Sequence, residues 1–182
     1  MIRLWQKIRS TCAAFGRSED GNMTVDFVII IPTAFLFASA TFEGGMIGLR
    51  NMMLEHGVDV VVRDVRTGRL LNPTHQRLVV EICDKAMIIP NCQKELKLEM
   101  VRTDIRNFNG LGPNPDCIDR SANGQPLVNF TTGGNNELMM LRACALFDPI
   151  LPTAALGAAV PKKSEGAYAL VATSSYVVEP FN

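Results

Sequence analysis

The chain has 182 residues, and its 18 lysines and arginines are balanced by 18 aspartates and glutamates, which gives a formal net charge of zero. This balance argues against a nucleic-acid binder, in which a basic excess is normal. With 47% hydrophobic residues and a mean hydropathy of +0.13, the chain is not intrinsically disordered. Two histidines and five scattered cysteines leave little material for a metal centre. Because no Walker loop, nucleophile elbow or H-E-x-x-H motif occurs, we expect no cofactor and no enzymatic activity.

An apolar segment near the N-terminus predicts a membrane-spanning helix. The run from Phe27 to Phe42 is free of charge, and with Glu43 as the one exception the apolar stretch continues to Leu49. As a helix, residues 27–49 are about 34 Å long, enough to cross a hydrocarbon layer of roughly 30 Å. Basic residues before the span place the N-terminus in the cytoplasm and everything after residue 50 outside it. These basic residues are Arg3, Lys7, Arg9 and Arg17.

The spacing of this segment leaves three interpretations open. The first is an uncleaved signal anchor. The second is a secretory signal peptide that is cut after Ala38-Ser39-Ala40. The third is a prepilin-type leader, which is cut after a glycine on the cytoplasmic side and carries an acidic residue five positions later. Gly21 and Asp26 have that spacing, which predicts a cut between Gly21 and Asn22.

Asp26 stands at the head of the predicted span, where an acidic residue is costly and therefore a functional candidate. A cut after Gly21 leaves a free ammonium group on Asn22. In a helical assembly the Asp26 carboxylate can neutralise that group on a neighbouring subunit, which sets the axial register. The alternative is that Asp26 caps its own helix and interacts with the helix dipole. The two roles are compatible.

Small residues and a proline suggest how the helix packs. Pro32 is expected to kink it. Ala40, Gly44 and Gly48 follow one another at intervals of four, so they share a face on which another helix can approach closely. The helical pattern continues beyond the span to a stop at Gly68. We expect one apolar face in this second part, formed by Leu49, Met53, Val60 and Val65.

The cysteines agree with this topology. Cys12 lies in the cytoplasmic leader, whereas Cys83, Cys92, Cys117 and Cys144 lie on the outer side. An even number in an oxidising compartment predicts two disulfides, with three possible connectivities. We favour Cys83–Cys92, which ties a helix end to the next strand, together with Cys117–Cys144.

Residues 69–182 predict an α+β head with a helix packed on an antiparallel sheet. Asn72 and Pro73 are expected to start a helix over Thr74–Ile89, and a half-buried strand follows at 95–106. Residues 107–126 form a long loop. A hairpin at 133–136 then joins a short strand to a central one, the excursion at Pro149–Pro161 holds one or two helical turns, and a last strand closes the sheet. The three later strands are Leu127–Thr132, Glu137–Phe147 and Tyr168–Val178.

The leader motif resembles that of the TadE-like family, pseudopilins of the tight-adherence pilus machinery. That motif is Gly21-Asn22-Met23-Thr24-Val25-Asp26-Phe27 followed by Ile31-Pro32, with Asp26 where the family favours glutamate. Further similarity covers most of the chain and is spread over Phe42-Glu43-Gly44-Gly45, Cys83 and Cys92, Leu141-Arg142-Ala143-Cys144, and Glu179-Pro180-Phe181.

The resemblance implies a pseudopilin or minor pilin that is processed by a prepilin peptidase and extracted from the bacterial inner membrane. Its expected partners are other pilin or pseudopilin subunits and the inner-membrane assembly platform, with no nucleic acid. Three segments are expected: a leader at 1–21, a helix at 22–68 and a periplasmic head at 69–182. The alternatives are a signal-anchored periplasmic scaffold that is never cut and a secreted binding domain released by signal peptidase.

Overall fold

A computed structural model of the chain describes residues 23–104, 106–107, 110–122, 129–152 and 155–180. The predicted cleavage site at Gly21 and Asn22, and Cys12, lie outside these residues. The chain divides into two compact units, residues 1–39 and 40–182. The second half of the long helix therefore belongs to the same unit as the sheet, whereas the sequence analysis begins the head at residue 69.

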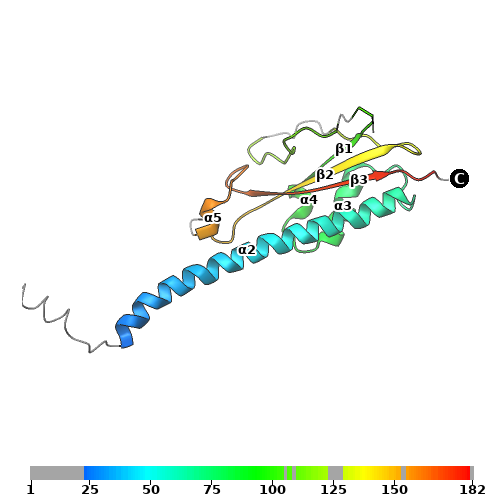
Figure 1. The fold of residues 1–182 in the computed structure, drawn as a ribbon. Helices are drawn as coiled ribbons and strands as arrows, with labels where there is room; N and C mark the ends of the chain where they lie inside the picture. Colours follow the sequence, from blue (N-terminus) through cyan, green and yellow to red (C-terminus); the bar gives the residue numbers. More distant parts are fainter. Residues whose placement is uncertain (1–22, 105, 108–109, 123–128, 153–154, 181–182) are drawn as a thin grey trace, which may run out of the picture. The chain divides into compact units, whose positions relative to one another are not determined.

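The first described element is the helix α2, Met23–Arg66, which runs without interruption through Pro32 (Figure 1). Its 44 residues correspond to a length of about 66 Å. By length and composition it is able to cross a membrane. Gly68, with a φ of 74°, follows its last turn and donates a backbone hydrogen bond to the carbonyl of Val65. The predicted stop at Gly68 is thus confirmed, because this positive φ favours glycine.

The sheet has three antiparallel strands in the order β1-β2-β3. They are β1 Leu96–Arg102, β2 Leu138–Phe147 and β3 Tyr168–Val177. The strand predicted to be central is β2, and it is central. The second half of α2 and the helix α3, His75–Ala86, lie along one face of this sheet (Figure 1). Alternate side chains of all three strands point to that inner face and form one hydrophobic core with the two helices. The α+β class is confirmed.

The helix α3, His75–Ala86, begins and ends differently from the prediction. Its N-cap is Thr74, whose hydroxyl accepts a hydrogen bond from the backbone N–H of Arg77, so the predicted cap at Asn72 is wrong. Its C-cap is Met87 with a φ of 26°, which ends the helix before Ile89. A short helix α4, Cys92–Glu95, leads into β1.

The core face of α2 is formed by Leu54, Val58, Val61 and Val62. The predicted face is wrong by part of a turn, since Leu49 is exposed. The position of α3 explains the difference. A Cβ atom added at Gly57 would lie 2.9 Å from the carbonyl oxygen of Ile82, so α3 crosses α2 closely at this glycine and buries the residues around it.

The strand predicted at Leu127–Thr132 and its hairpin are not formed by the described residues 129–136. Phe130 instead makes an isolated parallel bridge to Met100 on the free edge of β1. Tertiary contact with β1 therefore replaces the local hairpin to β2. The helical turn predicted in Pro149–Pro161 is confirmed as α5, Ala155–Ala159.

Both favoured disulfides are present. Cys83 and Cys92 join α3 to α4 with their Cα atoms 5.7 Å apart. Cys117 and Cys144 join the long loop to β2 with their Cα atoms 5.2 Å apart. These separations lie in the usual range for disulfides.

Candidate functional site

The first half of α2 carries a surface of exposed apolar side chains, which we call the apolar helix surface. It comprises Val25, Phe27, Val28, Ile29, Ile30, Ile31, Phe35, Leu36, Phe37 and Phe42. A soluble monomer seldom exposes so large a continuous apolar area. The segment from 23 to 42 is about 30 Å long as a helix, which matches the hydrocarbon thickness of a bilayer. Lipid or other apolar helices are the surroundings in which this surface is stable.

Asp26 lies in the first turn of α2 and is exposed there. A carboxylate at this position interacts favourably with the partial positive charge of the helix N-terminus. Phe27 follows it with 63% of its surface exposed, and Pro32 lies one to two turns further along the same segment. Asp26 thus lies in the first turn of α2, Phe27 belongs to the apolar helix surface, and Pro32 lies in the same exposed segment.

The apolar helix surface ends at Glu43, which is buried to 2% exposure against β3. The hydroxyl of Tyr168 donates a hydrogen bond of 3.1 Å to the Glu43 carboxylate. Burial, and secondarily this hydrogen bond, raise the pKa of Tyr168 to about 12, so the hydroxyl is a protonated donor at neutral pH. Glu43 is thus a structural residue of the head, although the sequence analysis includes it in the membrane span.

Two turns beyond Glu43, Arg50 is also nearly buried. Its guanidinium carbon lies 4.6 Å from the centroid of the Phe147 ring, a cation–π contact. The Phe147 and Tyr168 rings meet edge to face with centroids 5.2 Å apart. Glu43 and Arg50 therefore hold α2 on the ends of β2 and β3. Because these contacts exclude lipid from one side of the helix, the part of α2 exposed all round ends near Phe42 rather than at Leu49.

The predicted small-residue face divides between two environments. Gly44 lies against α5, since an added Cβ would stand 3.4 Å from Cδ2 of Leu156. A Cβ at Gly48 would meet nothing within 4 Å, and Ala40 is half-buried. The three residues do not form one interface within the chain. Gly48 stays open for contact with another helix.

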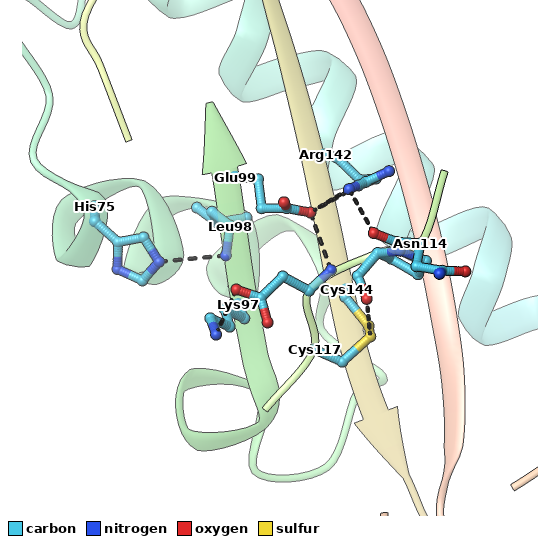
Figure 2. A network of polar contacts seen from close by, with 10 residues as sticks. His75, Lys97, Leu98, Glu99, Asn114, Cys117, Arg142 and Cys144 are labelled. Atoms are coloured by element: carbon cyan, nitrogen blue, oxygen red, sulfur yellow. Dashed lines mark hydrogen bonds and ion pairs between the residues drawn. A yellow bond between two sulfur atoms is a disulfide. The ribbon is translucent and has the colours of Figure 1, made fainter. Parts of the chain in front are cut away.

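The outer face of the sheet carries a buried polar network, shown in Figure 2. Glu99 on β1 and Arg142 on β2 are register partners, and their side chains form an ion pair of 2.7 Å. Arg142 also donates a hydrogen bond to the carbonyl oxygen of Asn114 (Figure 2) and another to that of Gly112. Glu99 accepts a hydrogen bond from the backbone N–H of Asp116. The long loop is thereby fastened over the sheet, with Cys117–Cys144 as its covalent tie.

Lys97 also holds the long loop over the sheet, because its ammonium lies 2.7 Å from the Asp116 carboxylate. Only 2% of Lys97 is exposed. The half-buried strand predicted at 95–106 is therefore wrong in one respect: β1 is buried on both faces. One feature of the sequence, the favoured Cys117–Cys144 disulfide, indicates that the outer face of the sheet is covered. A disulfide from the loop to Cys144, on the outer face of a central strand, requires the loop to lie on that face.

His75 protects the free edge of β1. Its Nε2 accepts a hydrogen bond of 3.2 Å from the backbone N–H of Leu98 (Figure 2). The His75 ring packs edge to face on Phe130. Desolvation, and secondarily the charge of Lys97, lower the pKa of His75, so the ring is neutral and able to accept. An edge strand whose N–H groups are occupied is a poor template for pairing with another chain.

Among the described residues, no three His, Cys, Asp or Glu side chains are placed to hold a metal ion. A hollow of about 220 Å³ near Leu70, Met100 and Tyr176 has no charged residue in its lining. The buried charges Lys97, Glu99 and Arg142 are ion-paired and serve to hold the loop.

Comparison with protein-family models, with curated proteins and with solved structures finds no match to this chain.

Proposed function

We propose that the chain is a TadE-like pseudopilin or minor pilin that takes part in assembling a tight-adherence pilus. A prepilin peptidase cuts it between Gly21 and Asn22, and α2 anchors it once in the bacterial inner membrane. Its N-terminus is cytoplasmic and its head is periplasmic. The observation that carries the proposal is the apolar helix surface, whose first residues, Val25 and Phe27, flank Asp26, five residues after Gly21.

The exposed side chains favour a function by assembly. Large aromatic and aliphatic groups surround α2 between residues 25 and 42, so this segment gains free energy from lipid before assembly and from neighbouring helices afterwards. In the fibre, Asp26 neutralises the ammonium group of Asn22 on an adjacent subunit and sets the register. The open face at Gly48 permits close helix contact. The two disulfides suit the oxidising periplasm.

A second function, as a secreted binding domain, is favoured by one specific observation. The compact unit that contains the head begins at Ala40, and a signal peptidase cut after Ala40 would leave a product that starts at Thr41. That product retains Glu43 and Arg50, and with them the contacts of α2 with β2 and β3.

The mature N-terminus separates these functions. Intact mass and Edman sequencing are carried out on protein from native membranes and from the surrounding medium. We expect a start at Asn22. A start at Met1 would leave an uncleaved anchored scaffold, and a start at Thr41 would indicate a secreted domain. Either of these results would overturn the pilus proposal.

A further inference from the structure

The connection between β2 and β3 is unusually long for neighbouring antiparallel strands. It runs from residue 148 to residue 167, whereas hairpin loops usually have about two to five residues. Its section from 149 to 161 contains no charged residue, and α5 lies within it. Long loops of this kind are commonly functional.

This connection lies against α2 at the point where the apolar helix surface ends. Gly44 faces Cδ2 of Leu156, and a Cβ added at Gly157 would collide with the Leu151 carbonyl and come within 3.0 Å of Glu43 Oε2. Figure 1 shows α5 beside α2, at the end of the sheet where β2 stops and β3 starts. Phe42, the last large residue of the apolar helix surface, is only about 3 Å from Gly44 along the helix axis.

The connection carries exposed apolar residues, which are followed along the chain by two lysines and then by Glu165. Ile150 is 43% exposed, and Pro152, Ala158 and Ala159 are also exposed. Lys162 and Lys163 follow directly and are also exposed, and the Lys162 ammonium donates to the Pro152 carbonyl, which keeps it beside the apolar residues. The acidic residue Asp148 is ion-paired with Arg120. Apolar residues with adjacent lysines are typical of segments that lie at a membrane surface.

We propose that the described parts of this connection, residues 149–152 and 155–163, rest on the outer surface of the bilayer that holds α2, with Ile150 at the boundary of headgroups and acyl chains. Lys162 and Lys163 contact the phosphates of anionic phospholipids. The inference rests on the proposed membrane anchor and adds a second lipid contact to it.

The experiment places single tryptophans in the full chain, in a Trp5→Phe background that removes the only natural one. Phe35→Trp reports on the anchor, Ile150→Trp on the connection, and Leu71→Trp on an exposed site beyond the far end of α2. That end lies about 33 Å from Gly44 along the helix. Each protein is reconstituted in vesicles of phosphatidylcholine and phosphatidylglycerol, and quenching by acyl-brominated lipid is measured.

We expect strong quenching for Phe35→Trp, clear quenching by shallow bromines for Ile150→Trp, and little for Leu71→Trp. If Ile150→Trp is quenched no more than Leu71→Trp while Phe35→Trp is quenched, the surface contact is refuted and the anchor stands. If Phe35→Trp is not quenched either, the anchor itself fails. Shielding of Ile150→Trp only in assembled pili would assign the connection to a protein partner and overturn the lipid contact.

The lysines are tested in the Ile150→Trp protein. Phosphatidylglycerol should raise its quenching by about twofold over pure phosphatidylcholine, and Lys162→Gln with Lys163→Gln should remove the increase because the attraction is electrostatic. The matched control, Lys85→Gln with Lys94→Gln, changes two lysines on α3 and α4. It should keep the increase in quenching that phosphatidylglycerol causes. An equal loss in both double variants would contradict a specific role for Lys162 and Lys163.

Discussion

The buried carboxylate of Glu43 accepts a hydrogen bond from the hydroxyl of Tyr168, a residue 125 positions further along the chain. This contact joins the long helix to the last strand of the sheet. It also marks the point on α2 at which the exposed apolar helix surface gives way to packing within the head.

Tyr168→Phe should lower the free energy of unfolding of the head by about 2 kcal/mol, because it leaves a buried carboxylate without this hydrogen bond. Denaturant unfolding in detergent, followed by near-UV circular dichroism, measures the change. In a Glu43→Gln background, where the buried group is uncharged, the same Tyr168→Phe change should cost less. Equal costs in the two backgrounds would show that the hydroxyl does not act through the Glu43 charge.

Two glycines of α2 should respond to alanine in opposite directions. Gly57→Ala forces a Cβ to within 2.9 Å of the Ile82 carbonyl oxygen, so it should destabilise the head by about 1–3 kcal/mol. Gly48→Ala meets nothing within 4 Å and should stabilise the helix by up to about 1 kcal/mol. If Gly48 serves helix contact between subunits, its alanine variant should fold well and still assemble poorly. Melting temperatures and pilus yield are measured on both variants.

The stability of the head should fall as the pH is lowered from about 7.5 to 5.5. The pKa of His75 is lowered in the folded protein, so the unfolded chain binds a proton first, near its ordinary value of about 6.5. Neutral His75 makes its full contribution to the free energy of unfolding above a pH of about 6.5. That contribution is lost progressively as the pH falls from there towards the lower pKa that His75 has in the folded protein. Urea unfolding at several pH values gives the slope.

His75→Gln should flatten this slope, since glutamine keeps an acceptor for the Leu98 N–H and does not titrate. His56, the other histidine, is exposed, and His56→Gln is the control that should keep the slope. An unchanged slope in His75→Gln would assign the pH dependence to other groups.

Gly21→Ala should reduce maturation by about tenfold or more, because an added methyl group fits poorly at the cleavage position of the peptidase. Immunoblots of membranes separate the precursor from the mature form by size. Gly16→Ala, also in the leader, should mature normally. Mature protein of normal size and amount from Gly21→Ala would refute the predicted cleavage site.

Asp26→Ala should leave cleavage intact and reduce incorporation into pili by about tenfold or more, since an unpaired ammonium in an apolar layer costs several kcal/mol. Pilus yield is quantified by shearing and immunoblotting. Asp26→Glu, with a longer reach to the same charge, should retain assembly. Asp59→Ala, which removes an exposed acid further along α2, is the matched control. A wild-type pilus yield from Asp26→Ala would contradict the proposal that Asp26 sets the axial register of the subunits.

The sequence by itself determined the features that depend on neighbours along the chain. The apolar run after Asp26, the stop at Gly68, the central strand ending at Phe147 and the turn of α5 all follow from local periodicity and turn chemistry. The pairing of the four outer cysteines was also predictable, because the favoured pairs join successive elements.

The tertiary structure alone decided which charges are buried. The sequence pattern places Glu43 in the membrane span and Lys97 and Glu99 on the solvent-exposed face of a half-buried strand, because it records polarity without the distant partner that binds each group. Tyr168 and Arg142 are those partners for Glu43 and Glu99, and both lie more than forty positions away. Contacts at such separation form only when the strands pair, so their free energy belongs to the fold and not to the local sequence.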